Sequence, residues 1–416
     1  MPLVVDPRGF DPFRLPKEIA FNAAGIAVLA ILAVAAILGR IHCADFPPFA
    51  WYYVIVAGWT AITVATATEH TLALHAALAI FGGMAFIATI SAEPLRTVNS
   101  VFVLLVPAVL NGGLYVLQEL RIWNPAISTK EFIAQMAASG KDWREEIHST
   151  STAFLGNPTD VAAFLIPTVI AFASLAVADR KRRPIFLAIA VVFAILMVST
   201  RILTAVFAMI AMLFVLATLI TRKSTLIALA VGICGGAFLF LYPPLRTKIH
   251  DTANDIRARR YGHILSSRLP AFLAAWEMIA DHKLIGIGPG CFSYQYFDYK
   301  LKAEGRHAWM LDSEARSINF AEAHNDHLQV AAEMGVPGYL LFLTGLALLA
   351  SGSFRRAAPA DPDVRTEFSR LCSLPLAVGF AIFAAAQFPL RLPAAMIGFL
   401  FLAGLAIAWR KPLVTD

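Results

Sequence analysis

The sequence predicts an all-α integral membrane protein, a polytopic bundle of about 11–12 transmembrane helices with one large, mainly helical loop outside the cytoplasm. Two observations support this prediction. The 416 residues are 58% hydrophobic and 15% charged, with a mean hydropathy of +0.68, whereas a soluble domain carries about 25% charged residues. Several apolar runs also reach the roughly 20 residues that a helix needs to cross a bilayer. No soluble fold competes with this interpretation.

Eleven apolar segments predict the spans in chain order. They lie at residues 19–38, 49–68, 72–90, 101–120, 159–178, 185–199, 202–221, 225–242, 328–350, 371–389 and 393–409. Basic clusters set the orientation, because Lys and Arg are enriched in cytoplasmic loops. The clusters at 180–183, 222–223, 355–356 and 410–411 are mutually consistent as cytoplasmic. They place the turn at Arg201, the segment 243–327 and the turn at Arg391 on the opposite side.

The N-terminal segment conflicts with this orientation. The apolar run Ile19–Leu38 is too long for the hydrophobic part of a cleavable signal, so we expect it to remain as a span. Counting back through eleven spans places Arg8, Arg14 and Lys17 outside, against the positive-inside rule. A missed span, a re-entrant helix or the lack of an N-terminal helix would each account for the conflict.

The predicted organisation has three parts within one integrated membrane domain. Residues 1–242 carry the N-terminal spans, 243–327 form a loop sub-domain, and 328–416 carry the C-terminal spans. The loop has eleven Lys or Arg against ten Asp or Glu, so its charge is nearly balanced. Apolar residues recur in it at helical spacing, namely Leu269, Phe272, Leu273, Trp276 and Ile279. This pattern predicts an amphipathic helix over 267–283 that lies against the membrane.

Composition argues against several kinds of partner and site. The four cysteines are Cys43, Cys234, Cys291 and Cys372, and no two of them have the spacing of a metal site or suggest a disulfide framework. The net charge of +6 is ordinary for a membrane protein with basic cytoplasmic loops, so no nucleic-acid partner is predicted. No cofactor motif is present either. GIGPG at 286–290 lacks the G-x-G-x-x-G frame and the P-loop lysine, so we interpret it as a tight turn outside the membrane.

Three arginines on the predicted outer side are candidate ligands for an anion. Arg201 interrupts a long apolar stretch, where a charge near hydrocarbon costs several kcal/mol unless it reaches water or a partner. A snorkelling anchor is the alternative for Arg201, but topology does not require a lone arginine on that side. Arg268 opens the predicted amphipathic helix and, taken alone, is most simply a solvated residue. For Arg391, in FPLRLPA, an interfacial anchor and an anion contact are equally compatible with the sequence.

The segment EAHNDHL at 322–328 places titratable groups where the loop returns to the membrane. His324 can accept a proton near neutral pH, as a general base that activates a hydroxyl must. The alternative is a polar cap on the following span. Metal binding by two histidines three residues apart is not favoured, because no further residue completes a familiar ligand set. The candidate supporting residues are Asn325, Asp326, His327, Glu333 and Arg391.

Together these segments resemble the O-antigen ligase family, which includes lipopolysaccharide O-antigen ligases and related polysaccharide polymerases. DPFRLPKE precedes an early span, GNPTDVAAFL precedes another, STR ends at Arg201, and R-x7-W-x9-G-I-G-P-G-x-F runs from Arg268. AHND and the late FPLRLPA turn follow. The most specific element is His-Asn, a nine-residue gap and then G-x-x-G. The resemblance covers about residues 11–409, and family members usually carry one more hydrophobic helix before the DPFRLPKE-like segment.

The resemblance implies a C-type glycosyltransferase of the bacterial inner membrane, with its active site facing the periplasm and no need for a metal or a nucleotide. The donor would be an undecaprenyl-diphosphate-linked glycan, and the acceptor a glycan or lipid A-core. Position by position, Arg201 and Arg268 match the arginines thought to hold the donor diphosphate. His324 matches the histidine thought to be the catalytic base.

Two alternatives remain open at this stage. Within the family, a polymerase, a ligase to lipid A-core and a ligase to protein share donor and base and differ in acceptor, so the shared motifs do not separate them; a polymerase or ligase of a surface polysaccharide is favoured over protein glycosylation. A transporter or flippase of lipid-linked glycans is the other class, and it predicts inverted repeats and charged, broken helices near the membrane centre. The charged candidates lie instead at the outer face and in the large loop, which favours an enzyme.

Overall fold

The computed structural model describes residues 14–38, 49–92, 98–123, 151–221, 243–258, 268–307, 319–354 and 363–410, with positions 226, 229 and 309. The regular elements in this part of the chain are all helices, as predicted. Seven of them are long and apolar enough to cross a membrane, and three shorter apolar helices accompany them. These ten coincide with ten of the predicted spans. The eleventh, 225–242, lies outside the described residues apart from two positions.

The helices follow one another along the chain without any other regular structure in the described ranges. The first group is α1 (Arg14–Ile37), α2 (Ala50–Ala65), α3 (His70–Ala92), η2 (Val98–Leu104), α4 (Leu105–Glu119), α7 (Pro158–Ala178), α8 (Arg183–Ser199) and α9 (Leu203–Ile220). The second group is α11 (Pro243–Arg257), α13 (Leu269–Asp281), α14 (Phe292–Arg306), α16 (Asp326–Ala350), η4 (Ser351–Phe354), α17 (Val364–Ala384), η5 (Pro389–Arg391) and α18 (Pro393–Ala408).

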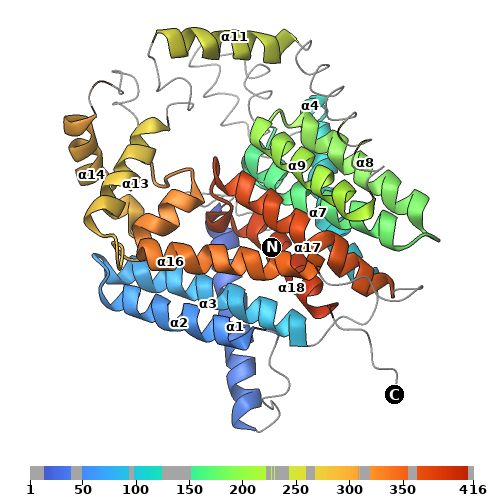
Figure 1. Cartoon of the computed structure of the whole chain (residues 1–416), viewed down its shortest axis with the longest axis horizontal. Helices are drawn as coiled ribbons and strands as arrows, with labels where there is room; N and C mark the ends of the chain where they lie inside the picture. The colour runs from blue at the N-terminus through green and yellow to red at the C-terminus, as the bar shows by residue number, and fades with distance from the viewer. Residues whose placement is uncertain are drawn as a thin grey trace.

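The main core is centred on α7, which packs against α8, α9, α17 and α18 (Figure 1). Its start is fixed by the sequence: the Asn157 side chain accepts a hydrogen bond from Thr159 N at 2.8 Å, and Pro158 occupies the first turn. Nearly every residue of α7 from Val161 to Ala176 is buried. A helix that is apolar on all sides is expected to be covered by other helices, as this one is.

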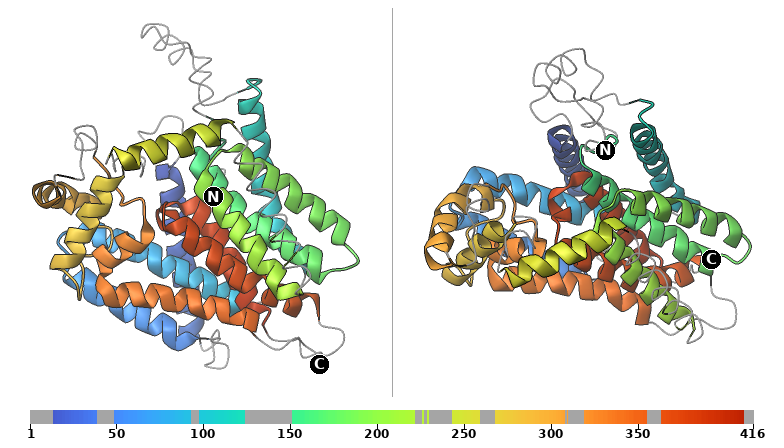
Figure 2. Two further views of the ribbon diagram at one scale, coloured as in Figure 1. Left: turned by 45° about the horizontal axis from the view of Figure 1, so that its top comes forward. Right: turned by 90° about the horizontal axis from the view of Figure 1, so that it is seen from above.

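A second, smaller core joins α13 and α14 to the start of α16 and the turn between α2 and α3. In Figures 1 and 2, α13 and α14 lie at the end of the molecule opposite α8 and α9. The predicted helix over 267–283 is confirmed as α13. Trp276 of the predicted apolar face is exposed, and the buried residues of α13 are Leu269, Pro270, Ala271, Ala274, Ala275, Glu277 and Met278.

The centre of α16 is broken at Gly335, which leaves helical geometry at φ 70° and ψ 177°, and Pro337 follows it. The break frees the carbonyl groups of Ala332 and Glu333 from the helical pattern. These two oxygens accept hydrogen bonds from backbone N–H groups of the glycine-rich turn 286–288, at 3.0 and 2.9 Å. Irregular backbone within a membrane protein needs such partners, because lipid supplies none.

Glycine is required on both sides of this joint. Gly286 has φ +77°, and a Cβ there would collide with the Glu333 carbonyl oxygen. A Cβ on Gly335 would collide with the Leu284 carbonyl oxygen. Both positions combine a left-handed backbone with close approach of another chain segment, and only glycine meets both conditions. In the structure GIGPG is a tight turn that docks on α16.

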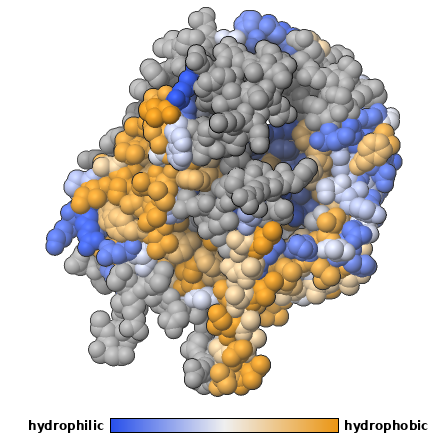
Figure 3. All heavy atoms as spheres, turned by 180° about the vertical axis from the view of Figure 1, so that it is seen from behind, coloured by the Kyte–Doolittle hydropathy of each residue, from blue (hydrophilic) through white to orange (hydrophobic). Residues whose placement is uncertain are grey.

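The surface carries the apolar character expected of a bilayer protein. The end of α1 that projects from the body is covered by hydrophobic side chains (Figure 3). Along α1, five apolar side chains are largely exposed, namely Ile19, Ile26, Ile31, Val34 and Ile37. Exposed apolar area on this scale is uncommon on soluble monomers. It is consistent with a lipid-facing helix.

Gly335→Ala should destabilise the fold, because the new Cβ meets the Leu284 carbonyl and alanine disfavours φ +70°. The expected cost is about 1–3 kcal/mol or more, seen as a lower thermal unfolding midpoint of the detergent-purified protein. Gly305→Ala in α14 is the matched control, because nothing lies within 4 Å of the added Cβ. A midpoint for Gly335→Ala equal to that of the control would contradict this account of the joint.

Candidate active site

His324 lies just before α16, with a left-handed backbone at φ +53°. Its ring is held edge-on between Phe320, at 5.4 Å between ring centroids, and Phe388, at 4.5 Å. Nδ1 is buried and has no hydrogen-bond partner among the described residues. The two aromatic contacts hold the plane of the imidazole, so Nδ1 has a defined position and its hydrogen-bonding capacity is unused among the described residues.

Burial and positive charge keep this imidazole neutral. Desolvation, the Arg268 guanidinium and the Arg14 guanidinium lower the pKa of His324 to about 4, while the Glu322 carboxylate opposes them. At neutral pH the ring therefore carries no charge and can accept a proton.

Arg268 immediately precedes α13 and reaches across to the segment that follows α17. Its Nη1 donates to the Ala386 carbonyl oxygen at 2.7 Å. Burial lowers the pKa of Arg268, but a guanidinium stays protonated in proteins. Its described partner is a neutral carbonyl, so the positive charge beside His324 is not cancelled by a carboxylate.

Arg14, at the start of α1, makes an ion pair with Glu322, two residues before His324. Nη2 of Arg14 lies 2.6 Å from Oε1 of Glu322. The Arg14 Nε also pairs with Glu18 one turn further along α1, at 2.7 Å. The sequence analysis assigned no site role to Arg14 and noted only its conflict with the positive-inside rule and its place in the DPFRLPKE segment. In the structure Arg14 lies beside the candidate base.

Asn325 and Asp326 hold the backbone around His324. The Asn325 side chain caps α16 by accepting from Leu328 N at 3.1 Å. Asp326 is buried, and its Oδ2 accepts from Leu390 N at 2.8 Å. Asn325 therefore fixes the first turn of α16, and Asp326 ties that turn to η5.

His327 belongs to the packing between helices rather than to the His324 cluster. Its Nε2 lies 2.9 Å from the Ala381 carbonyl oxygen of α17. Because a carbonyl can only accept, Nε2 carries the proton, and Nδ1 accepts from the Tyr339 hydroxyl at 3.3 Å. Both ring nitrogens are thus occupied by structural partners.

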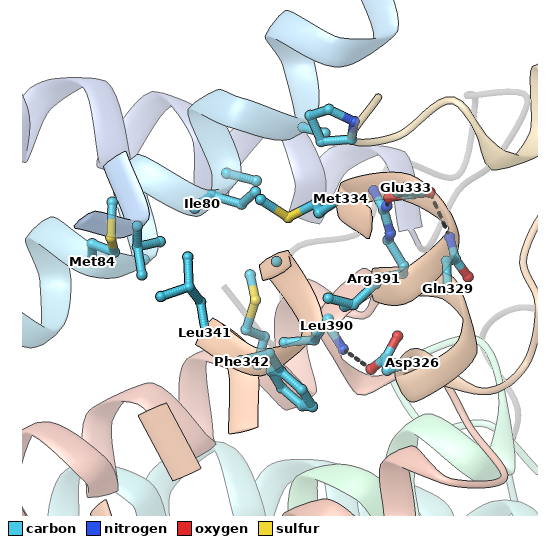
Figure 4. Close-up of a pocket in the computed structure, with 18 of the residues that line it drawn as sticks. Ile80, Met84, Asp326, Gln329, Glu333, Met334, Leu341, Phe342, Leu390 and Arg391 are labelled. Carbon is cyan, nitrogen blue, oxygen red and sulfur yellow. Dashed lines mark hydrogen bonds and ion pairs between the residues drawn. The ribbon is translucent and has the colours of Figure 1, made fainter. Parts of the chain in front are cut away.

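Glu333 gathers three donors just before the break in α16 (Figure 4). Its Oε2 accepts from Gly290 N at 2.8 Å and pairs with Nη2 of Arg391, and its Oε1 accepts from Gln329 Nε2 at 3.0 Å. The Glu333 side chain is only 4% exposed, so these contacts supply the hydrogen bonds that a buried carboxylate needs.

Two cavities meet at Arg391. An apolar cavity of about 280 Å³ lies among α2, α3, α16 and α18, and Figure 4 shows apolar side chains of α3 and α16 around it, among them Ile80, Met84, Leu341 and Phe342. A more polar cavity of about 470 Å³ adjoins it, lined in part by Arg14, His75 and Glu322. Gln329, Leu390 and Arg391 line both cavities. The apolar cavity and the more polar cavity are thus adjacent and have these residues in common.

Arg201 lies in the turn between α8 and α9, exposed and with φ +60°. Its charge acts on Tyr115 of α4, whose hydroxyl donates to the Ser199 carbonyl oxygen at 3.0 Å. It is not among the groups that act on His324. The described contacts therefore bring Arg268 to His324, and leave Arg201 at a separate turn.

Arg201 and His324 share an uncommon backbone state. In the described ranges, five non-glycine residues have positive φ, and these are two of them. Such residues cluster at functional sites, where surrounding structure holds the strain.

A profile of the family described as O-Antigen ligase matches residues 185–343. The matched segment runs from α8 past the break in α16, and it contains Arg201, Arg268 and His324. Residues 185–343 of this chain are thus similar to the O-antigen ligase family. The predicted family resemblance is therefore confirmed over the segment that holds the candidate site. No curated protein sequence matches the chain.

Some residues of the candidate site were missed or left without a role by the sequence. Arg14 was missed because its partner, Glu322, lies more than 300 positions away; the DPFRLPKE segment that contains Arg14 was the available signal. Asp326 was named as supporting, but its bond to the Leu390 backbone is a tertiary contact with no sequence pattern. Among the described residues, no group of three or more His, Cys, Asp or Glu is arranged to hold a metal ion.

Glu333→Ala should destabilise the protein, because it leaves the Arg391 guanidinium without a carboxylate beside an apolar cavity. Breaking a buried pair costs about 3–5 kcal/mol, a value we treat as an upper bound because Arg391 is 25% exposed. Thermal unfolding in detergent measures the change. Asp281→Asn, which removes an exposed partner of Lys302, is the control and should cost at most about 1 kcal/mol. Equal midpoints for the two variants would refute the structural role of Glu333.

Proposed function

We propose that this chain transfers a glycan from an undecaprenyl-diphosphate carrier to an acceptor hydroxyl, at a site that faces the periplasm of the bacterial inner membrane. The observation that carries the proposal is the buried, neutral imidazole of His324 beside the Arg268 guanidinium, inside the segment that is similar to the O-antigen ligase family. The acceptor is a glycan or lipid A-core, and the reaction is that of an O-antigen ligase or a surface-polysaccharide polymerase.

In the proposed reaction His324 acts as general base. It takes the proton of the acceptor hydroxyl as the oxygen attacks the anomeric carbon. The bond between that carbon and the diphosphate oxygen breaks, and its electron pair leaves with the diphosphate. One displacement of this kind inverts the anomeric configuration. The geometry supports this role because the two aromatic contacts hold the ring in place.

The charge on the leaving diphosphate needs fixed cations. Four arginines are candidates: Arg14, Arg201, Arg268 and Arg391. Arg14 and Arg391 are each paired with a carboxylate, whereas Arg201 and Arg268 make no ion pair with a carboxylate among the described residues. Two guanidiniums with uncompensated charge are suited to an oxyanion that develops in the transition state. This distinction supports Arg268 and Arg201 as donor ligands.

The two cavities that meet at Arg391 suit an amphiphilic donor. The apolar cavity among α2, α3, α16 and α18 offers hydrocarbon contacts for part of a polyprenyl chain, and the adjoining polar cavity offers charged and hydrogen-bonding groups to a head group. Ligand sites commonly combine an apolar lining with a few placed polar groups.

His324→Ala should lower transfer by about 10²–10⁴-fold, the usual contribution of a general base. The assay uses purified protein, a lipid-linked oligosaccharide and a candidate acceptor, and it measures release of undecaprenyl diphosphate with EDTA present. His282→Ala, in an exposed histidine of the same loop, is the matched control and should retain activity. Arg201→Ala and Arg268→Ala should each lose transfer while expression is retained.

Three outcomes of this assay would contradict the proposal. Full activity of His324→Ala would show that His324 is not the general base. A strict need for a divalent metal would contradict the proposal that two arginines stabilise the leaving diphosphate. Movement of the lipid-linked glycan across a vesicle bilayer without any transfer would favour a transporter.

The pH dependence should differ between kcat/KM and kcat. kcat/KM reports the free protein, in which His324 has a pKa of about 4, so its acid limb should lie near that pH. In the donor complex the diphosphate neutralises Arg268 and favours the imidazolium, so the acid limb of kcat should lie at higher pH, by roughly 1–3 units. Coincident limbs for the two parameters would contradict this assignment.

A further inference from the structure

The ion pair between Arg14 and Glu322 joins the first helix of the chain to the loop that carries His324. The two side chains are separated by 2.6 Å between Nη2 and Oε1, and the Glu322 side chain is only 12% exposed. Arg14 belongs to the DPFRLPKE segment, which the proposed reaction leaves without a role. A contact at this distance between residues over 300 positions apart requires α1 to be docked against the site.

The docking of α1 is close and specific. α1 packs along α3, and the helices approach so closely that a Cβ on Gly25 would lie 2.8 Å from Gly82 Cα. Arg14 stands at the start of α1, before the apolar run that begins at Pro16. Its guanidinium lines the polar cavity beside Glu322 and Arg391. α1 therefore presents a charge to the site as well as an apolar face to the lipid.

Three charged groups from different elements act on His324. Arg268 comes from the start of α13, Glu322 from the loop itself, and Arg14 from α1. Glu322 is the one anion of the three, and it favours the imidazolium. The position of the Glu322 carboxylate therefore affects the pH at which His324 becomes protonated.

We propose that Arg14 is a positioning residue, which holds the Glu322 carboxylate in an ion pair with α1 and so keeps His324 free to take the acceptor proton. Without the guanidinium, the Glu322 carboxylate is no longer held in the ion pair with α1, and it already acts on the imidazole two residues away. Glu322 then stabilises the imidazolium further, so His324 becomes protonated, and is lost as a base, at a higher pH. This inference rests on the proposed role of His324 and extends it to a residue at the other end of the chain.

The test follows the titration of His324 by NMR of protein labelled with 13C-histidine in detergent. The resonance is assigned by its loss in His324→Ala. In Arg14→Gln the midpoint of His324 should rise by roughly one pH unit, because a positive charge is removed and Glu322 is released. In the double variant Arg14→Gln/Glu322→Gln the midpoint should return close to the wild-type value, because the released carboxylate is gone.

The controls separate charge from general disruption. Arg14→Lys keeps the charge and should leave the midpoint near wild type. Glu18→Gln removes a second carboxylate that pairs with Arg14 and should not move the midpoint, since Glu18 is not among the groups acting on His324. If Arg14→Gln does not fold, Arg14→Met keeps the apolar stem and gives the same prediction. An unchanged midpoint in the charge-removing variant, or a shift that persists in the double variant, would overturn the inference.

Activity gives a second readout. In Arg14→Gln the acid limb of kcat/KM should move to higher pH with the NMR midpoint, and activity near pH 8 should be retained. A uniform loss at every pH, with no shift of the limb, would show a merely structural role for Arg14 and would also overturn the inference. Because the titration needs no substrate, failure of glycan transfer would sink the proposed function and leave this test intact.

Discussion

The joint between the break in α16 and the glycine-rich turn 286–290 is the constraint on which the rest of the site depends. Backbone groups that the kink would leave unpaired in a membrane protein are paired instead with the turn, so neither segment is stable in this form alone. The turn connects α13 to α14, and it therefore fixes α13 relative to α16. That places Arg268, before α13, beside His324, before α16. The same part of α16 supplies Glu333, which holds Arg391 and the Gly290 backbone.

The electrostatics of the site follow from this geometry. His324 is caught between two aromatic rings and close to a guanidinium, and both burial and positive charge disfavour its protonated form. An imidazole whose pKa lies far below the ordinary value is unprotonated and can accept a proton, but it is a weak base. Proton transfer is most effective when the pKa lies near the working pH. An anionic donor beside Arg268 would reverse part of this shift. Substrate charge and base strength are thereby coupled through one arginine.

The sequence predicted the helical fold and most of its spans, because apolar length and basic flanks are local properties of the chain. It also predicted the break at 335–338, since glycine and proline act on their own backbone. The candidate base and arginines were identified through the order of motifs and not by physics alone. Arg14 could not be found in this way, because hydropathy does not say which helices are neighbours. His327 shows the same limit: beside His324 in the sequence, it is bonded to α17 in the structure.

The arginines of the candidate site differ in whether a carboxylate neutralises them, and this difference affects how favourably each could bind an anion. An arginine near hydrocarbon is costly without a counter-charge, and Glu322 and Glu333 supply one each to Arg14 and Arg391. A diphosphate at either of these would compete with a carboxylate, whereas at Arg268 it would compete only with a neutral carbonyl contact. The gain from binding an anion is therefore expected to be larger at Arg268 than at Arg14 or Arg391. In the proposed reaction, a donor diphosphate bound at Arg268 would therefore raise the pKa of His324, whereas the carboxylates of Glu322 and Glu333 stay paired with Arg14 and Arg391.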